Sequence, residues 1–60
     1  MKENDVIEGA DITEGMKVQR LIDGKPCHHP MIVYSDSPYL NNRLYADDEF
    51  TFLGHEYNAD

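Results

Sequence analysis

The sequence of 60 residues has one cysteine, no tryptophan and no apolar run long enough to span a membrane, which takes about 20 residues. A lone cysteine closes no intramolecular disulfide, and secreted domains of this size normally carry an even set. We therefore expect a reduced, cytoplasmic protein. Residues 1–5 are mostly polar and no apolar run follows them, so they do not fit a secretory signal peptide.

Basic residues are also scarce: five Lys and Arg stand against twelve Asp and Glu, for a formal net charge of −7. This balance argues against capture of nucleic acid or anionic lipid, which depends on cationic side chains. The charge is −4 over residues 1–15, +2 over residues 16–45 and −5 over residues 46–60. We interpret the acidic ends either as solvating segments that help hold the basic middle, or as an acidic surface for a basic partner.

Residues typical of strands and turns fill the chain from position 15 onward. Residues 16–22, 31–34, 43–46 and 49–53 are predicted as four strands, with residues 31–34 in the centre because they are the most β-prone. Asp23-Gly24 predicts either a tight turn followed by irregular residues or a longer loop, and Asn41-Asn42 predicts a second turn.

The predicted fold is mainly β: a small antiparallel four-stranded meander or a partly open barrel. Residues 1–14 are expected to form a flexible acidic arm in which a short strand fits residues 5–8, residues 15–54 the β domain, and residues 55–60 a C-terminal tail. The side chains expected to face inward are Met16, Val18, Ile22, Met31, Val33, Leu44, Phe50 and Phe52. So small a core needs curvature, arm packing or a second copy of the chain, and a homodimer is one of these alternatives.

One stretch of the chain resembles a known family. Gly-Met-Lys-Val at residues 15–18, Asp-Gly-Lys-Pro at 23–26 and Pro-Met-Ile-Val at 30–33 are similar to the opening of the YodC-like small bacterial proteins. The resemblance implies a small SH3-like β fold and brings no catalytic residue. The sequence departs from the pattern in Cys-His-His at residues 27–29 and in lacking a later strand with tryptophan.

Side chains with the chemistry of metal ligands or catalysts are few. Four residues have the donor atoms for a zinc site: Cys27, His28, His29 and His55. Consecutive residues seldom converge on one ion, and a second close-spaced pair is missing, so we expect loop side chains and no metal or cofactor. The sequence also has no glycine-rich phosphate loop and no serine elbow, which favours a protein that is not an enzyme.

Aromatic residues on alternate strand positions give the clearest binding signal. The candidate partner-binding residues are Ile32, Tyr34, Tyr39, Arg43 and Tyr45. Alternation alone leaves open whether Tyr34 and Tyr45 face solvent or the core. The sequence thus predicts a small protein-binding module. Alternatives are an acidic inhibitor of a nucleic-acid-handling enzyme, of the kind found in phages and mobile elements, and a weak nucleic-acid binder that uses the +2 middle.

Overall fold

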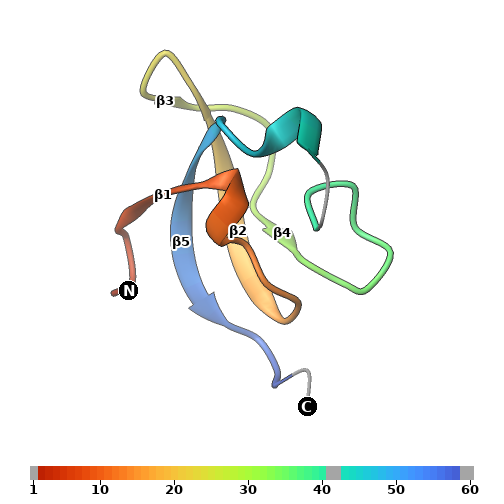
Figure 1. The fold of residues 1–60 in the computed structure, drawn as a ribbon. Helices are drawn as coiled ribbons and strands as arrows, with labels where there is room; N and C mark the ends of the chain where they lie inside the picture. Colours follow the sequence, from red (N-terminus) through yellow and green to blue (C-terminus); the bar gives the residue numbers. More distant parts are fainter. Residues whose placement is uncertain (1, 41–42, 59–60) are drawn as a thin grey trace.

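The computed structural model describes residues 2–40 and 43–58, which form one antiparallel sheet and two short 3-10 helices (Figure 1). The strands are β1 (Val6–Glu8), β2 (Met16–Ile22), β3 (Lys25–Pro26), β4 (Met31–Ile32) and β5 (Glu49–His55), and the helices are η1 (Gly9–Asp11) and η2 (Arg43–Tyr45). The prediction of a mainly β, antiparallel fold is confirmed, with five strands in place of four. Among the described residues, no helix is long and apolar enough to cross a membrane.

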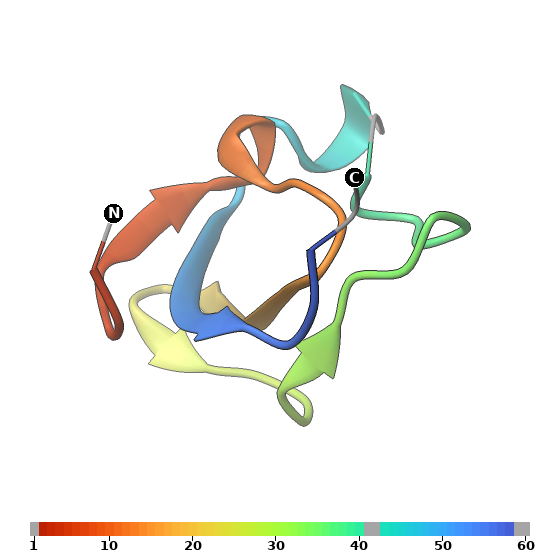
Figure 2. The same ribbon diagram turned by 90° about the horizontal axis from the view of Figure 1, so that it is seen from below.

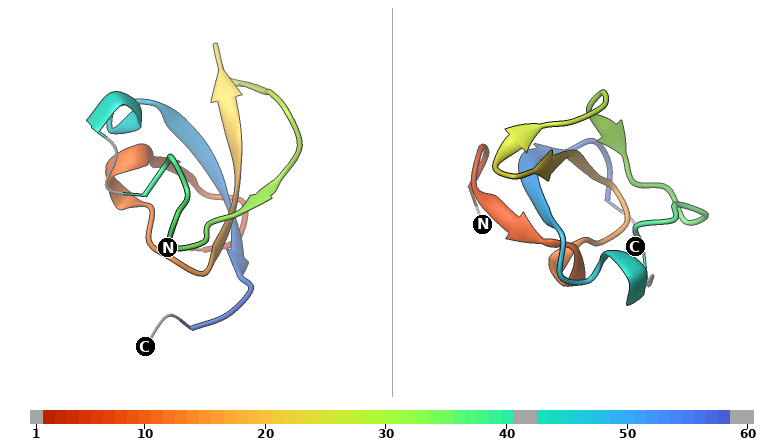
Figure 3. Two further views of the ribbon diagram at one scale, coloured as in Figure 1. Left: turned by 90° about the vertical axis from the view of Figure 1, so that its right-hand side faces the viewer. Right: turned by 90° about the horizontal axis from the view of Figure 1, so that it is seen from above.

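The two seven-residue strands, β2 and β5, form the middle of the sheet. The strand order is β1-β5-β2-β3, and β4 pairs with β2 on the same edge as β3. The sheet is strongly curved, so that the strands run around a central core when seen along its axis (Figures 2 and 3). Curvature is therefore one means by which this short chain covers its own core.

The hairpin between β2 and β3 decides between the two alternatives left open at Asp23-Gly24: the chain makes the tight turn and not the longer loop. Ile22 pairs with Lys25, so the turn has two residues, and both have positive φ: 53° at Asp23 and 76° at Gly24. This is the backbone of a two-residue turn that matches the twist of the flanking strands. Irregular residues follow from Cys27 onward.

Two of the predicted strands are wrong: one lies at the edge of the sheet and not in its centre, and the other is a 3-10 helix. Residues 31–34 do not form the central strand, because β4 has two residues and lies at the sheet edge, although Val33 still donates its N–H to the Met16 carbonyl at 2.8 Å. Residues 43–46 do not form a strand, since residues 43–45 make the 3-10 helix η2. The turn predicted at Asn41-Asn42 lies outside the described residues.

The N-terminal segment is part of the sheet, which corrects the expectation of a flexible arm. β1 pairs with β5 over its whole length, and this is the short strand that fits residues 5–8. The N–H of Gly9 donates to the Asp48 carbonyl at 2.8 Å, which ties η1 to the start of β5. Ile7 and Ile12 are both buried, so the segment supplies two side chains to the core.

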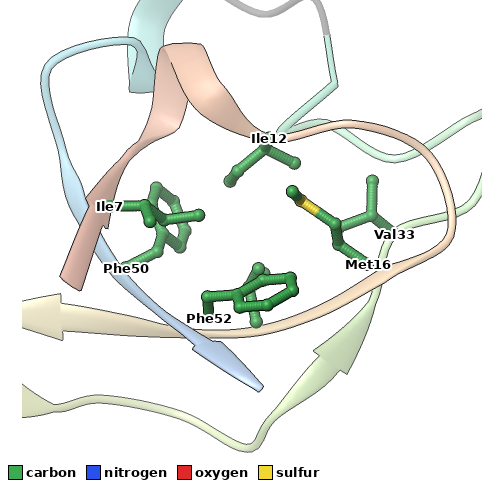
Figure 4. Close-up of a cluster of buried hydrophobic side chains, with 7 residues drawn as sticks. Ile7, Ile12, Met16, Val33, Phe50 and Phe52 are labelled. Atoms are coloured by element: carbon green, nitrogen blue, oxygen red, sulfur yellow. The ribbon is translucent and has the colours of Figure 1, made fainter. Parts of the chain in front are cut away.

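The core lies on the concave side of the sheet (Figure 4). Its buried members are Ile7, Ile12, Met16, Val18, Val33, Phe50 and Phe52. Five of these were predicted. Three predictions are wrong because the positions lie at margins: Ile22 is at the exposed end of β2, Met31 is in the short edge strand, and Leu44 is 84% exposed on η2.

Candidate functional site

The four tyrosines of the chain form two separate ring pairs. Tyr39 and Tyr45 meet edge to face, with centroids 4.9 Å apart at 87°. Tyr34 stacks on Tyr57, with centroids 6.1 Å apart at 23°. The predicted binding set is therefore divided, and Tyr57, which was expected to lie in the tail, joins Tyr34.

The Tyr39–Tyr45 pair supports the core. Both rings are half-buried, and Tyr39 also contacts Phe50, at 5.0 Å between centroids. The Arg20 guanidinium lies 5.2 Å from the Tyr45 centroid, and its Nη2 is 3.1 Å from Asp48 Oδ2. Tyr45 thus lies between the core and the Arg20–Asp48 ion pair. Of the two alternatives for this residue, solvent or core, its ring packs toward the core.

The Tyr34–Tyr57 pair lies at the surface. Tyr34 is 53% exposed, so this residue faces solvent. Tyr57 is half-buried and its hydroxyl donates to Glu14 Oε2 at 3.1 Å, with the Val33 carbonyl oxygen 3.5 Å away. One ring is therefore fixed by hydrogen bonding, and it supports a second ring that solvent or a partner can reach.

Gly15 explains how the chain end reaches Tyr34. Its carbonyl accepts a hydrogen bond from the Glu56 N–H at 2.7 Å, and its own N–H donates to the Val33 carbonyl at 2.8 Å. A Cβ on Gly15 would lie 2.1 Å from the Tyr57 carbonyl oxygen, so the close approach requires glycine. Residues 55–57 are accordingly packed against the domain and do not form the predicted tail.

The electrostatic surroundings of Tyr57 are negative. Burial raises the pKa of its hydroxyl above 10.0, and the hydrogen bond to Glu14 and the charges of Glu14, Tyr34 and Asp36 raise it further. The hydroxyl therefore remains protonated at neutral pH and keeps its role as a donor.

The remaining predicted residues lie elsewhere. Ile32 is half-buried in β4 and pairs with Lys17 of β2, while the side chain of Arg43 is outside what the structure describes. No local pattern in the sequence indicates the contact of Tyr57 with Tyr34. That contact follows from the hydrogen bonds at Gly15, which join distant parts of the chain.

The candidate zinc ligands do not form a site. Cys27 is half-buried and its N–H donates to the Arg20 carbonyl, whereas the His55 ring packs edge-on against Phe52 at 5.2 Å. The carbonyl of His28 accepts a hydrogen bond from Gln19 Nε2 at 3.1 Å. Within residues 2–40 and 43–58, no three His, Cys, Asp or Glu side chains are grouped so that they could hold a metal ion.

The two acidic ends of the sequence meet in the sheet. Glu8 of β1 lies directly opposite Glu49 of β5, and both are exposed on the convex face. Like charges in directly opposed positions oppose strand pairing. The pairing of β1 with β5 therefore carries an electrostatic cost.

The variant Glu49→Gln is expected to stabilise the protein by about 0.2–1 kcal/mol, because it removes this repulsion and keeps the shape of the side chain. Urea unfolding of the variant and the parent protein measures the difference. Glu3→Gln is the matched control, since it removes the same charge from an exposed residue outside the paired strands. An equal gain in both variants would assign the effect to net charge and contradict the pairwise explanation.

Comparison of the chain with protein-family models, with curated proteins and with solved structures gave no significant match. The similarity of residues 15–34 to the YodC-like proteins therefore stays a prediction. The geometry of the surface is accordingly the basis on which a function can be assigned.

Proposed function

We propose that the protein is a small non-enzymatic protein-binding module that docks its partner on the surface around Tyr34 and Tyr57. The observation that carries the proposal is the exposed Tyr34 ring stacked on a hydrogen-bonded Tyr57 ring. Tyrosine is enriched at binding interfaces because its rigid ring offers a large contact area at a low entropic cost. Half-buried Ile32 lies two residues before Tyr34 in the sequence.

The sheet supports this proposal by holding the pair in a fixed place. Tyr34 directly follows Val33, whose backbone is hydrogen-bonded on both sides. The Val33 N–H donates to the Met16 carbonyl, and the Val33 carbonyl accepts from the Gly15 N–H. Tyr57 follows β5 and is bonded to Glu14. Binding residues on a rigid scaffold lose little conformational freedom on association, which favours affinity.

The test is affinity capture from cells of the native host, with the purified protein and its variants as bait. Tyr34→Ser is expected to reduce recovery of the partner at least fivefold with the fold intact, because the ring is half exposed and a central interface aromatic commonly contributes more than 1 kcal/mol. Val6→Ser is the matched control, since Val6 is 58% exposed on β1, in another part of the sheet. Circular dichroism of each variant verifies the fold.

Recovery of the same partner by Val6→Ser and its loss with Tyr34→Ser would support the proposal. Equal recovery with both variants would contradict it. The measurement concerns one surface, so a partner that binds elsewhere does not count in its favour.

A second candidate is the acidic inhibitor of a nucleic-acid-handling enzyme. The observation that favours it is the meeting of the two acidic ends, with Glu8 opposite Glu49 on an exposed face. A surface of this charge suits the basic channel of such an enzyme. In the capture experiment it would show as recovery that Tyr34→Ser retains and that moderate salt abolishes.

Three finer features belong to the proposal. We place the module in a reducing compartment such as the cytoplasm, since its one cysteine, Cys27, is a free thiol. We describe its curved open sheet as an SH3-like arrangement, which the strand curvature supports. The partner is a protein rather than a nucleic acid, because the net charge of −7 repels phosphate.

A further inference from the structure

The carboxylates around the Tyr34–Tyr57 pair indicate what kind of partner this surface would bind. Glu14 accepts the hydrogen bond of the Tyr57 hydroxyl, and Asp36 lies two residues after Tyr34 in the sequence. Asp36 lies in the turn that the Ser37 N–H closes on the Tyr34 carbonyl at 2.9 Å. Two tyrosine rings and the Glu14 carboxylate thus lie together at the surface, and Asp36 is in the turn that directly follows Tyr34.

The same molecule already shows what such a group of side chains holds. The Arg20 guanidinium lies over the Tyr45 ring, with 5.2 Å from Cζ to the ring centroid, and it pairs with the Asp48 carboxylate at 3.1 Å. The Tyr45 ring and the Asp48 carboxylate therefore both contact the Arg20 guanidinium. Cations are attracted to the negative face of an aromatic ring and to the carboxylate at once.

The surface pair also combines aromatic rings with a carboxylate, and no ion pair among the described side chains involves that carboxylate. The ion pairs among the described side chains are Lys17 with Glu56 at 3.8 Å and Arg20 with Asp48. Neither includes Glu14 or Asp36. The hydrogen bond from the Tyr57 hydroxyl to the Glu14 carboxylate polarises the Tyr57 phenol and makes its ring more electron-rich, which adds to the negative potential beside the exposed Tyr34 ring.

We propose that the Tyr34–Tyr57 pair, with Glu14 and Asp36, binds an arginine or lysine side chain of the partner, so that the docked segment of the partner is basic. This inference rests on the proposed function and adds the chemistry of the partner to it. The cation lies over the exposed Tyr34 ring, and the two carboxylates neutralise it. The net charge of −7 brings basic segments toward this surface.

The probe is the capped peptide Gly-Arg-Gly-Arg-Gly, and its control replaces both arginines with citrulline, a neutral residue of the same shape. Each peptide is titrated into the 15N-labelled full chain, and amide chemical shifts are followed by NMR. The arginine peptide is expected to shift the amides of Tyr34, Tyr57 and Glu14, and the citrulline peptide to leave them nearly unchanged.

Two variants test the named groups. Tyr34→Ser and Glu14→Gln are each expected to weaken binding of the arginine peptide about two- to fivefold, which is the range for a cation at an exposed aromatic site. Glutamine keeps an oxygen that can accept the Tyr57 hydrogen bond, so Glu14→Gln removes charge without removing the anchor. Tyr34→Phe keeps the ring and is expected to bind as the parent protein does, and so is Glu3→Gln, which removes an equal charge elsewhere.

The outcomes separate the inference from the proposed function. Equal binding of the arginine and citrulline peptides at Tyr34 would contradict the inference that the surface recognises a cationic side chain. The proposed protein-binding surface would still stand. Equal weakening by Glu3→Gln and Glu14→Gln would assign binding to net charge and overturn the site. The absence of shifts at Tyr34 with either peptide would overturn the inference, while partner capture by Tyr34→Ser decides the proposed function separately.

Discussion

Replacing Phe50 with alanine is expected to remove a large part of the free energy of unfolding of the protein at 25 °C, about 3–5 kcal/mol. The side chain is 0% exposed, its ring contacts Tyr39, and its residue pairs with both Ile7 and Arg20 across the sheet. Truncation of a buried phenylalanine costs about 3–5 kcal/mol. A chain of this length has a free energy of unfolding of roughly 3–9 kcal/mol, so the loss removes much or all of it.

Urea unfolding followed by circular dichroism measures this effect, with NMR peak dispersion as a second readout. Phe50→Leu keeps most of the apolar volume and is expected to lose less stability than Phe50→Ala. Val6→Ala is the matched control on the strand that pairs with β5, and because Val6 is exposed its change is expected to stay within about 0.5 kcal/mol. An unfolding midpoint for Phe50→Ala equal to that of Val6→Ala would show that the core does not depend on this ring.

The parts of the fold that local pattern determines were predictable. Residues 16–22 alternate and form β2 with the same bounds, and β5 begins at Glu49 as predicted and extends two residues further. Asp23-Gly24 predicts a turn at this place, and of the two alternatives, a tight turn or a longer loop, the structure has the tight turn with positive φ at both positions. In these segments the local preference and the tertiary contacts agree.

The parts that depend on distant contacts were not predictable. The apolar residues of the N-terminal segment show no clear period, yet Ile7 is buried because β1 pairs with β5 across more than forty residues of sequence. Leu44 has the pattern of an inward strand residue, but η2 points it outward. For the candidate site, Tyr34 was predicted from its strand position, whereas Tyr57 was missed because its contact depends on Gly15, for which the local sequence has no signal.

Gly15 is therefore expected to be the residue whose substitution most affects the candidate surface. Gly15→Ala adds a Cβ 2.1 Å from the Tyr57 carbonyl oxygen and places alanine at a φ of 93°, a conformation that disfavours side chains. The backbone strain alone costs about 1–3 kcal/mol. Relief of the overlap requires the chain to move away at Tyr57, so we expect the variant to lose the Glu56–Gly15 hydrogen bond and the Tyr34–Tyr57 stack.

Gly54→Ala is the control that separates these two effects. Gly54 has a φ of 98°, nearly that of Gly15, but an added Cβ would meet nothing within 4 Å. Both variants carry the backbone strain, and only Gly15→Ala displaces Tyr57. We therefore expect a greater loss in urea unfolding for Gly15→Ala, faster hydrogen exchange at the Glu56 amide, and weakened binding of the arginine peptide in that variant alone. Equal results for the two variants would mean that strain at positive φ explains the whole effect and that the Tyr57 carbonyl yields without cost, so that the surface would not depend on the close approach at Gly15.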